Sequence, residues 1–292
     1  MPTTIPTTTS STRPGSPSTG DAYFETDTKN YIIYDGTNWR GYESDGASGW
    51  SGSNSYSLNF DGTDDQLRSS SLVTSSAQQG TISAWIKTTN PASGFIPFFS
   101  ISNNNSGVTN EWMAFQVDNV GNLELITNNS GTVEKTESSF AIDNGNWRHV
   151  VATSDGSSRK LFIDGSEDTS ATGTSTGTWI GDLSTKTACT IGGMRRDADT
   201  VNSFFNGNID ELAVWDSALT AAQITNIYKG ESNGGSGGTN GTPGNLISFS
   251  PKAWWRMGDG VEANSGTIIY DMSSFSNDMT MVSSPAYQSD TP

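Results

Sequence analysis

The stretch Asn146-Trp-Arg-His-Val-Val-Ala152, followed by Leu161-Phe-Ile-Asp-Gly165, decides the fold of this chain. Both runs are short and rich in apolar residues, and Asp155-Gly156 separates them. Apolar runs of this length that are joined and ended by Asp-Gly pairs are typical of β-strands connected by tight turns. The stretch therefore predicts two consecutive strands of a β-rich domain.

Similar runs continue on both sides, from Tyr56 to Tyr228. Tyr56-Ser-Leu-Asn-Phe-Asp-Gly62 comes first and Gly207-Asn-Ile-Asp-Glu-Leu-Ala-Val-Trp215 comes near the end, and alternation of apolar and polar residues marks both as strands. Short strands at this spacing, separated by Gly and Asp turns, predict an all-β fold, an antiparallel sandwich or jelly roll. Further strands are expected at residues 81–87, 95–102, 111–117, 122–127, 147–153, 160–163 and 187–191.

One helix is expected directly after the last of these strands. Thr220-Ala-Ala-Gln223 is a capping box, in which the Thr hydroxyl and the Gln amide each bond the other residue's backbone N–H. Leu219 and Ile224 form the accompanying hydrophobic staple, and Gly230 ends the helix.

The composition limits the partners of the chain. Its 292 residues carry a net charge of −16, which disfavours nucleic acid and anionic membranes and favours solubility and cation binding. No apolar run approaches the roughly 18 residues needed for membrane insertion, and the Met1-Pro-Thr-Thr start lacks a secretory signal. Cys189 is the only cysteine, so an intramolecular disulfide is excluded and synthesis in a reducing cytosol is expected.

Composition also divides the chain into segments. Residues rich in Thr, Ser, Pro and Gly cannot build a core, whereas aromatic and β-branched runs can. The expected segments are a flexible N-terminal arm (1–20), a β-hairpin with a linker (21–50), the sandwich (51–230), a flexible Gly-rich tether (231–245) and tail strands (246–292).

The hairpin segment resembles a small module that recurs near the ends of bacteriophage structural proteins. The module has the form G-D-x-Y-F-x-T-D-T-x-x-x-x-x-Y-D-G-T-x-W. The matching residues here are Gly20, Asp21, Tyr23, Phe24, Thr26, Asp27, Thr28, Tyr34, Asp35, Gly36, Thr37 and Trp39.

The sandwich segment resembles the laminin G-like, concanavalin A-like lectin/glucanase superfamily over roughly residues 56–229. The motifs that carry this resemblance are Phe60-Asp-Gly62, Ile82-Ser-Ala-Trp-Ile86, Trp147-Arg-His-Val-Val-Ala152, Leu161-Phe-Ile-Asp-Gly165 and Gly207-Asn-Ile-Asp-Glu-Leu212. The terminal helix segment Ala218-Leu-Thr-Ala-Ala-Gln-Ile224 also matches. In this order and spacing they predict the lectin-like sandwich.

The tail carries a pattern that in this superfamily normally precedes the F-D-G strand. Trp254-Trp-Arg-Met-Gly-Asp-Gly260 and Gly266-Thr-Ile-Ile-Tyr-Asp-Met-Ser273 supply it here, after the domain. The tail is therefore expected to complete a sandwich, either its own or that of a neighbouring subunit by strand exchange. The remaining alternative is an incomplete second domain, too short to bury its own core.

Asp210 is the sharpest candidate for a metal ligand. Period-two alternation places it on the same face as Leu212 and Val214, where a carboxylate needs a partner. The resemblance implies that Asp210 and Asp61 contribute to a structural Ca²⁺ site, with Asp64 and Asp65 close enough to help. The alternative is that Asp210 only accepts hydrogen bonds from the backbone.

Other candidate residues carry weaker signals. Trp112, Trp179 and Trp215 are candidates for a sugar-stacking platform, with core or intersubunit packing as the alternative, and Arg195-Arg196-Asp197 is a candidate polar loop contact. His149 is the only histidine and is expected to be structural, because no His-based metal site or triad can be built from one.

Glucanases of this superfamily need a carboxylate pair on one strand to cleave a glycosidic bond. The only E-x-D in a strand context is Glu25-Thr-Asp27, and Asp210 and Glu211 are expected on opposite faces, so no catalytic pair is evident.

Three classes of function remain open. The favoured one is a non-enzymatic structural protein on the virion surface of a tailed phage, a capsid decoration or fibre that contacts other virion proteins as a homo-oligomer. The first alternative is a glycan-binding adhesin that recognises a cell-surface glycan. The second alternative is a glycan hydrolase.

Overall fold

The computed structural model describes residues 6–19, 21–25, 30–34, 39–43, 54–69, 76–89, 94–174, 176–197, 200–259 and 266–292. The chain divides into two compact units, Met1–Ser53 (unit 1) and Asn54–Pro292 (unit 2). Each unit is described by itself.

Unit 1 contains a four-stranded sheet in the order β1-β2-β3-β4. Strand β1 is parallel to β2, and the other two pairings are antiparallel. The aromatic strands predicted around the hairpin are present. Most of the predicted turns, and residues 44–53 of the linker predicted at 43–55, lie outside the described residues. The elements are β1 (Thr7–Thr8), a 3₁₀ turn (Ser10–Thr12), β2 (Ala22–Glu25), β3 (Asn30–Tyr34) and β4 (Trp39–Glu43).

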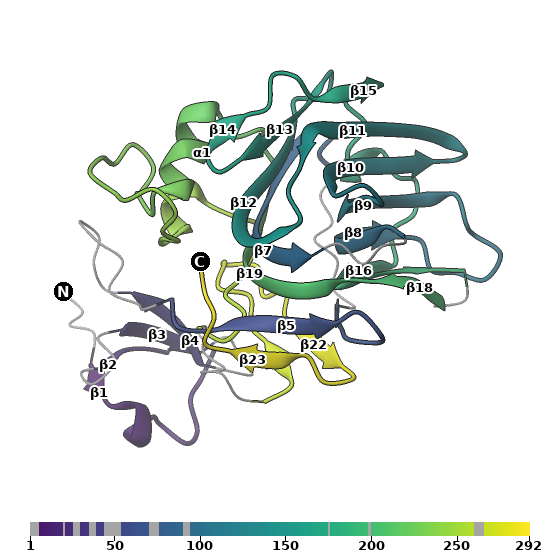
Figure 1. The fold of residues 1–292 in the computed structure, drawn as a ribbon. Helices are drawn as coiled ribbons and strands as arrows, with labels where there is room; N and C mark the ends of the chain where they lie inside the picture. The colour runs from purple at the N-terminus through teal and green to yellow at the C-terminus, as the bar shows by residue number, and fades with distance from the viewer. Residues whose placement is uncertain are drawn as a thin grey trace. The chain divides into compact units, whose positions relative to one another are not determined.

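Unit 2 is a sandwich of two antiparallel sheets (Figure 1). The nine-stranded sheet has the order β15-β11-β10-β9-β8-β16-β6-β22-β21. Its strands are β6 (Gln66–Ser69), β8 (Ile96–Ser102), β9 (Glu111–Val117), β10 (Asn122–Asn129), β11 (Thr132–Ala141), β15 (Thr172–Thr174), β16 (Ala188–Ile191), β21 (Ile268–Ile269) and β22 (Met279–Val282).

The eight-stranded sheet has the order β14-β13-β12-β7-β19-β5-β23, with β20 paired to β19 beside it. A separate hairpin of β17 (Gly193–Arg196) and β18 (Thr200–Phe204) follows β16. The strands of this sheet are β5 (Ser57–Asp61), β7 (Gly80–Thr89), β12 (Asn144–Ser154), β13 (Arg159–Ile163), β14 (Ser166–Glu167), β19 (Asn206–Trp215), β20 (Ala253–Trp255) and β23 (Ala286–Gln288).

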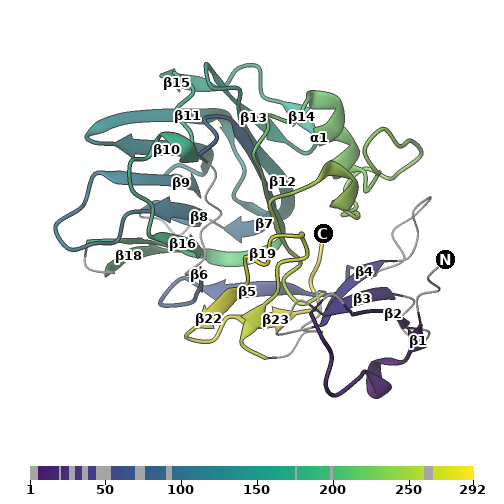
Figure 2. The same cartoon turned by 180° about the vertical axis from the view of Figure 1, so that it is seen from behind.

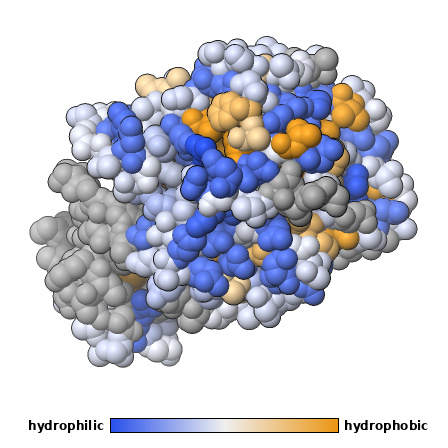
Figure 3. All heavy atoms as spheres, in the orientation of Figure 1, coloured by the Kyte–Doolittle hydropathy of each residue, from blue (hydrophilic) through white to orange (hydrophobic). Residues whose placement is uncertain are grey.

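The hydrophobic core lies between the two sheets. Alternate residues of β7 and β9 point into it, and Phe98 contacts Phe115 and Phe205 with ring centres 4.6 and 6.1 Å apart. The face of the molecule seen in Figure 3 is mostly hydrophilic, with apolar residues in small separate groups. The predicted all-β, lectin-like sandwich is therefore confirmed.

The predicted helix is α1 (Ala221–Tyr228). Thr220 is its N-cap, and the capping box is present: the Gln223 amide N–H donates to the Thr220 hydroxyl and the Thr220 N–H donates to the Gln223 side chain, at 3.3 and 2.9 Å. The helix lies beside β14 in both ribbon views (Figures 1 and 2). Within the described residues, no helix is long and apolar enough to cross a membrane.

The tail strands pair with strands of the same chain. Trp255 of β20 lies opposite Leu212 of β19, β22 pairs with β6, and β23 pairs with β5. Figure 1 shows β23 beside β5, although the two strands are far apart in the sequence. The segment 231–245, expected as a free tether, is instead hydrogen-bonded to the end of α1, where the Gly241 and Thr242 N–H groups donate to the Tyr228 carbonyl.

Candidate functional site

The outer face of the nine-stranded sheet carries an aromatic and polar surface. On β9 the alternation sends Met113 and Phe115 into the core, so that Trp112 and Ala114 lie on the outer face. Ala114 lies opposite Ile126 of β10, and the two pack with Trp112 in a small apolar cluster. This cluster forms a floor on the outer face.

The β17–β18 hairpin contacts this floor through Met194, and Figures 1 and 2 show β18 next to β16. The Ser100 hydroxyl of β8 donates to the Gly193 carbonyl at 2.8 Å, and the Ser102 hydroxyl donates to the Arg195 carbonyl at 2.5 Å. These two bonds fix β17 along β8. We call the resulting group of residues the outer shelf, with Trp112, Ala114 and Ile126 as its floor and Met194 and Arg196 as its wall.

Arg196 lies over the ring of Trp112, with its guanidinium carbon 5.3 Å from the ring centre. The indole N–H of Trp112 donates to the Thr109 carbonyl at 3.1 Å, which holds the ring in place. Within the described residues, the Arg196 guanidinium has this ring contact and no hydrogen bond or ion pair. Burial alone lowers the pKa of Arg196, without a contribution from any carboxylate.

A row of paired polar side chains borders the outer shelf. The Gln116 amide donates to Glu124 at 2.7 Å, and the Lys135 ammonium lies 3.3 Å from Glu124 and 2.5 Å from Glu137. Burial raises the pKa of Glu124, although the bonds from Gln116 and Lys135 act in the opposite direction. Lys135 is 48% exposed and lies opposite Ile126, so this row offers a charged hydrogen-bond donor to solvent next to an apolar side chain.

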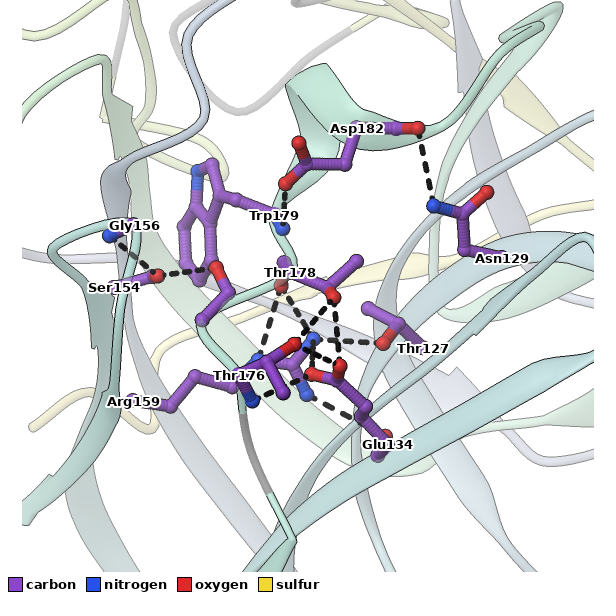
Figure 4. A network of polar contacts seen from close by, with 11 residues as sticks. Thr127, Asn129, Glu134, Ser154, Gly156, Arg159, Thr176, Thr178, Trp179 and Asp182 are labelled. Carbon is purple, nitrogen blue, oxygen red and sulfur yellow. Dashed lines mark hydrogen bonds and ion pairs between the residues drawn. The ribbon is translucent and has the colours of Figure 1, made fainter.

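A second polar network is buried between β11 and β13 and is shown in Figure 4. The Arg159 guanidinium donates to the Thr178 carbonyl, to the Thr127 hydroxyl at 2.7 Å and to the Glu134 carbonyl at 3.4 Å. The Glu134 carboxylate accepts from the hydroxyls of Thr176 and Thr178. Burial lowers the pKa of Arg159 to about 10. Because these groups bond one another, we assign the network to stability.

Three of the predicted metal-ligating residues gather in the turn after β5. One oxygen each of Asp61, Asp64 and Asp65 lies within 4.8 Å of the other two. Both oxygens of Asp65 accept backbone N–H groups, from Asp61 at 3.1 Å and from Ser284 at 2.9 Å. One oxygen of Asp61 accepts the Thr63 N–H at 2.7 Å.

Asp210 does not belong to that group, and its predicted orientation is wrong. Asp210 lies opposite Trp85, whereas Leu212 points into the core. The cause is a β-bulge: Glu211 has φ +49°, and the register of β19 against β7 shifts there, so the period-two alternation breaks. Asp210 is nevertheless fully buried, with Oδ1 accepting the Glu211 N–H at 2.8 Å and Oδ2 without a hydrogen bond.

The carboxylates at the bulge are tied to the tail. Glu211 accepts from Arg256 at 3.1 Å and from the indole N–H of Trp254 at 2.5 Å. Burial and the neighbouring Glu211 carboxylate raise the pKa of Asp210 well above its usual range, and burial raises the pKa of Glu211 to about 6. This buried pair anchors β20 to β19.

Two of the predicted sugar platforms need correction. Trp179 and Trp215 are each 1% exposed, and the indole N–H of Trp215 donates to the Phe249 carbonyl, so neither ring offers a face to a ligand. Core packing, the alternative, describes both. Trp112 is the one candidate of the three on the outer shelf, but it is only 9% exposed and Arg196 lies over its ring, so it supports the shelf from below. The sequence predicts Arg196 only as part of a polar loop contact, because its contact with Trp112 joins residues that are far apart in the chain.

His149 is structural, as predicted. It is fully buried against Trp85 and Tyr228, with ring centres 5.1 and 5.9 Å away, and its Nε2 shares a 2.8 Å hydrogen bond with the Ser83 hydroxyl. Burial lowers its pKa to about 3. A neutral, buried imidazole of this kind packs α1 onto the eight-stranded sheet.

Comparison with known proteins agrees with this architecture. Residues 61–225 match the family described as the concanavalin A-like lectin/glucanases superfamily. The chain belongs to this superfamily. No curated protein matches it in sequence.

Some solved structures resemble part of this chain at low sequence identity. A sialidase CBM40 from Ruminococcus gnavus bound to α2,3-sialyllactose is 18% identical, with 57% of this chain and 96% of that chain covered and a TM-score of 0.48. A heptameric SAP-like pentraxin from Limulus polyphemus is 21% identical, with 60% and 82% covered and a TM-score of 0.46. A leech intramolecular trans-sialidase is 20% identical, with 60% and 27% covered and a TM-score of 0.47.

Proposed function

We propose that unit 2 binds carbohydrate without cleaving it, and that the outer shelf is the binding surface. The observation that carries this proposal is a set of accessible side chains on one face of the sheet: the partly exposed Ile126 opposite the exposed Lys135, and the Arg196 guanidinium, which has no hydrogen bond or ion pair within the described residues. Binding sites for small molecules combine apolar walls with a few fixed polar groups. Ile126, which is partly exposed, offers the C–H face of a sugar an apolar contact, and Arg196 and Lys135 offer its oxygens charged donors. Membership of a lectin superfamily supports the same function.

The carboxylates near the shelf support binding rather than hydrolysis. A glycosidase needs one carboxyl group that protonates the leaving oxygen and a second that attacks or activates water. Glu124 and Glu137 both share the Lys135 ammonium, and Glu124 also accepts from Gln116, so neither carboxylate is free to act. The other candidate pair, Glu25 and Asp27, lies outside the described residues, except for the Glu25 backbone in β2.

Replacing Lys135 by Ala is expected to weaken glycan binding roughly tenfold, the effect of losing one charge-assisted hydrogen bond. Lys160→Ala is the matched control, because Lys160 is a similarly exposed lysine paired with Glu167 at 3.1 Å on the other sheet. A glycan array identifies the ligand. Titration calorimetry then measures the Kd of that ligand for the wild type and for the two variants. An array without any bound glycan, or equal losses in both variants, would contradict the proposal.

We further propose that the turn holding Asp61, Asp64 and Asp65 binds a structural Ca²⁺. The donor set fits this ion in part: the oxygens are hard ligands, and within the described residues the second oxygen of Asp61 and the carboxylate of Asp64 carry no hydrogen bond. Asp65 already bonds two backbone N–H groups and would position the turn. The ion would neutralise the three carboxylates and join the turn to the segment before β23.

Adding Ca²⁺ at about a hundredfold excess over its Kd is expected to stabilise unit 2 by about 2.7 kcal/mol. For a unit of this size the melting temperature should rise by roughly 5–10 °C relative to EDTA. Differential scanning calorimetry with and without Ca²⁺ measures the shift. Asp64→Asn should abolish it, whereas Asp155→Asn, which alters another Asp-Gly turn, should retain it. A melting temperature that is the same with Ca²⁺ and with EDTA would exclude the site.

For unit 1 we propose attachment to the particle of a tailed phage, as part of a capsid decoration or fibre. The phage-type motif around Asp21 and Trp39 supports this role, as does the separation of unit 1 from the sandwich. Deleting residues 1–42 is expected to abolish incorporation into particles and to leave unit 2 folded, measured by immunoblots of purified particles and by circular dichroism. Normal incorporation of the truncated chain would exclude this role.

A further inference from the structure

We propose that the outer face of the eight-stranded sheet is a docking site for a peptide segment that carries a single aspartate, and that Asp290 of this chain fills the site as an autoinhibitory contact. The site lies on the other sheet from the outer shelf, and it does not depend on the proposed carbohydrate function. It is recognised by three hydrogen-bond donors that converge on one residue.

Three strands of the sheet each supply one donor to Asp290. The Lys87 ammonium of β7 and the Trp147 indole N–H of β12 donate to its two carboxylate oxygens at 2.6 and 3.0 Å. The Ser57 hydroxyl of β5 donates to the main-chain carbonyl of the same residue at 2.7 Å. We call these three donors the aspartate site. An aspartyl residue in a peptide presents both the carboxylate and the carbonyl, whereas a simple carboxylate such as acetate presents only the first.

The register of the sheet places the side chains around this site in one row. Trp147 lies opposite Lys87, Lys87 lies opposite Asn208, and Asn208 lies opposite Asn59. Ile86 points into the core, so its neighbour Lys87 and the rest of the row face outward. The pairing of the strands therefore sets the spacing of the donors.

The Ser57 hydroxyl is oriented by two amides of this row. The Asn59 amide donates to the Asn208 side-chain oxygen at 3.0 Å, and the Asn208 amide donates to the Ser57 hydroxyl at 2.9 Å. Ser57 is fully buried and Asn208 is 9% exposed, so both are held in place by their surroundings. Because the Ser57 oxygen accepts from Asn208, its own proton points to the carbonyl of the docked residue. Such preorganisation lowers the entropic cost of docking.

The docked segment is held less firmly than the site itself. The Asp290 side chain is 48% exposed and the Lys87 side chain is 32% exposed, and an exposed ion pair contributes only about 0–1 kcal/mol. Residues 288–292, all of which the structure describes, place no side chain in the hydrophobic core. A competing aspartyl segment can therefore displace residue 290 while the sheet stays folded.

The charges of the site and of the chain limit the partner. The Lys87 ammonium lowers the pKa of Asp290, and the Trp147 N–H acts in the same direction, so the site favours an ionised carboxylate. The net charge of −16 repels a polyacidic segment at longer range. One ammonium and two neutral donors match one carboxylate and one carbonyl. The partner is therefore a peptide with one aspartate among neutral residues, as in Gln288-Ser-Asp-Thr-Pro292.

The test restores the carboxylate from outside to a full chain that lacks it. In Asp290→Ala the indole N–H signal of Trp147, assigned by heteronuclear NMR with Trp147→Phe, should move because its acceptor is gone. A blocked peptide of residues 288–292 is expected to return the signal with a Kd of about 1 mM or below. The same peptide with Asn in place of Asp should bind at least about tenfold more weakly, and acetate at least about threefold more weakly. Wild type should also bind the peptide at least about tenfold more weakly, because Asp290 fills the site.

A second substitution in Asp290→Ala supplies the matched pair of controls. Lys87→Gln should abolish the response to the peptide, whereas Lys160→Gln, at an exposed lysine of the same sheet, should retain it. Asp290→Asn takes the place of Asp290→Ala if that variant does not fold by circular dichroism. A Trp147 signal that does not respond to about 10 mM peptide overturns the site. Equal binding of acetate overturns the peptide class, equal binding by wild type overturns the autoinhibition, and loss of the response with Lys160→Gln overturns the assignment to Lys87.

Discussion

A chain that ends at Asn245 is expected to lose the fold of unit 2. The tail places Ala253, Trp255, Met257, Ile269 and Met279 in the core, where all five side chains are buried. Burying one large apolar side chain contributes about 1.5–3 kcal/mol, so the four larger ones contribute roughly 6–12 kcal/mol. That sum is comparable to the total stability of about 5–15 kcal/mol expected for a domain.

The polar contacts of the tail point the same way. The buried Asp271 carboxylate accepts the N–H groups of Trp254, Ser273 and Asn277 at 2.8–2.9 Å, which holds the tail in one conformation. Without the tail, β6 and part of β19 lose a partner strand and expose backbone groups. Asp271→Ala in the full chain should therefore destabilise unit 2 by several kcal/mol, since buried N–H groups are left unpaired.

Circular dichroism and thermal melts of the truncated chain measure this effect, and adding a peptide of residues 246–292 should restore the fold. A permuted chain is the matched control. The Thr291 hydroxyl donates to the Asn54 carbonyl at 3.2 Å, so the two ends of unit 2 meet. Placing residues 246–292 before Asn54 should therefore keep the melting temperature. A truncated chain that melts like wild type would contradict the whole argument.

Sequence patterns identified the strands whose inner face is apolar, and they missed β11. The inward side chains of β11 include Glu134, Thr136 and Ser138, which are buried although they are polar. Alternation of apolar and polar residues cannot identify such a strand, because both of its faces carry polar side chains. Glu134 points inward but packs against the Arg159 network instead of the apolar core. The predicted orientation of Asp210 was wrong for a related reason. Glu211 has a positive φ, and this shifts the alternation of inward and outward side chains by one residue.

The candidate site was less accessible to sequence analysis than the fold. Trp112 was named, but its partner Arg196 lies 84 positions later by residue number and reaches it only through the β17–β18 hairpin on β8. The Asp61, Asp64 and Asp65 group could be anticipated because its members share one turn. Local spacing therefore predicts sites within a turn, while a site assembled across strands requires the register of the sheet.

Replacing Arg159 by Ala is expected to destabilise unit 2 by about 3–5 kcal/mol, the cost of removing one member of a buried charged network. The Arg159 side chain is fully buried, and its loss leaves the Thr178 and Glu134 carbonyls without its N–H donors. Urea unfolding followed by fluorescence measures the change. Lys160→Ala is the control in the same strand, where an exposed ion pair should contribute less than about 1 kcal/mol.

The geometry of this network also predicts how much of the lost unfolding free energy comes from the ion pair between Arg159 and Glu134. The ion pair itself is long, with 3.7 Å between the Arg159 Nη2 and the Glu134 carboxylate oxygen, whereas the closer bonds of Arg159 go to the neutral oxygens of Thr178 and Thr127. A double-mutant cycle of Arg159→Met and Glu134→Gln should therefore give a coupling energy below about 1 kcal/mol, even though Arg159→Met alone is costly. The reason is that Arg159 mainly satisfies carbonyl and hydroxyl groups, which stay unpaired in both backgrounds. A coupling of 3 kcal/mol or more would instead show that the charge pair holds this edge of the sandwich together.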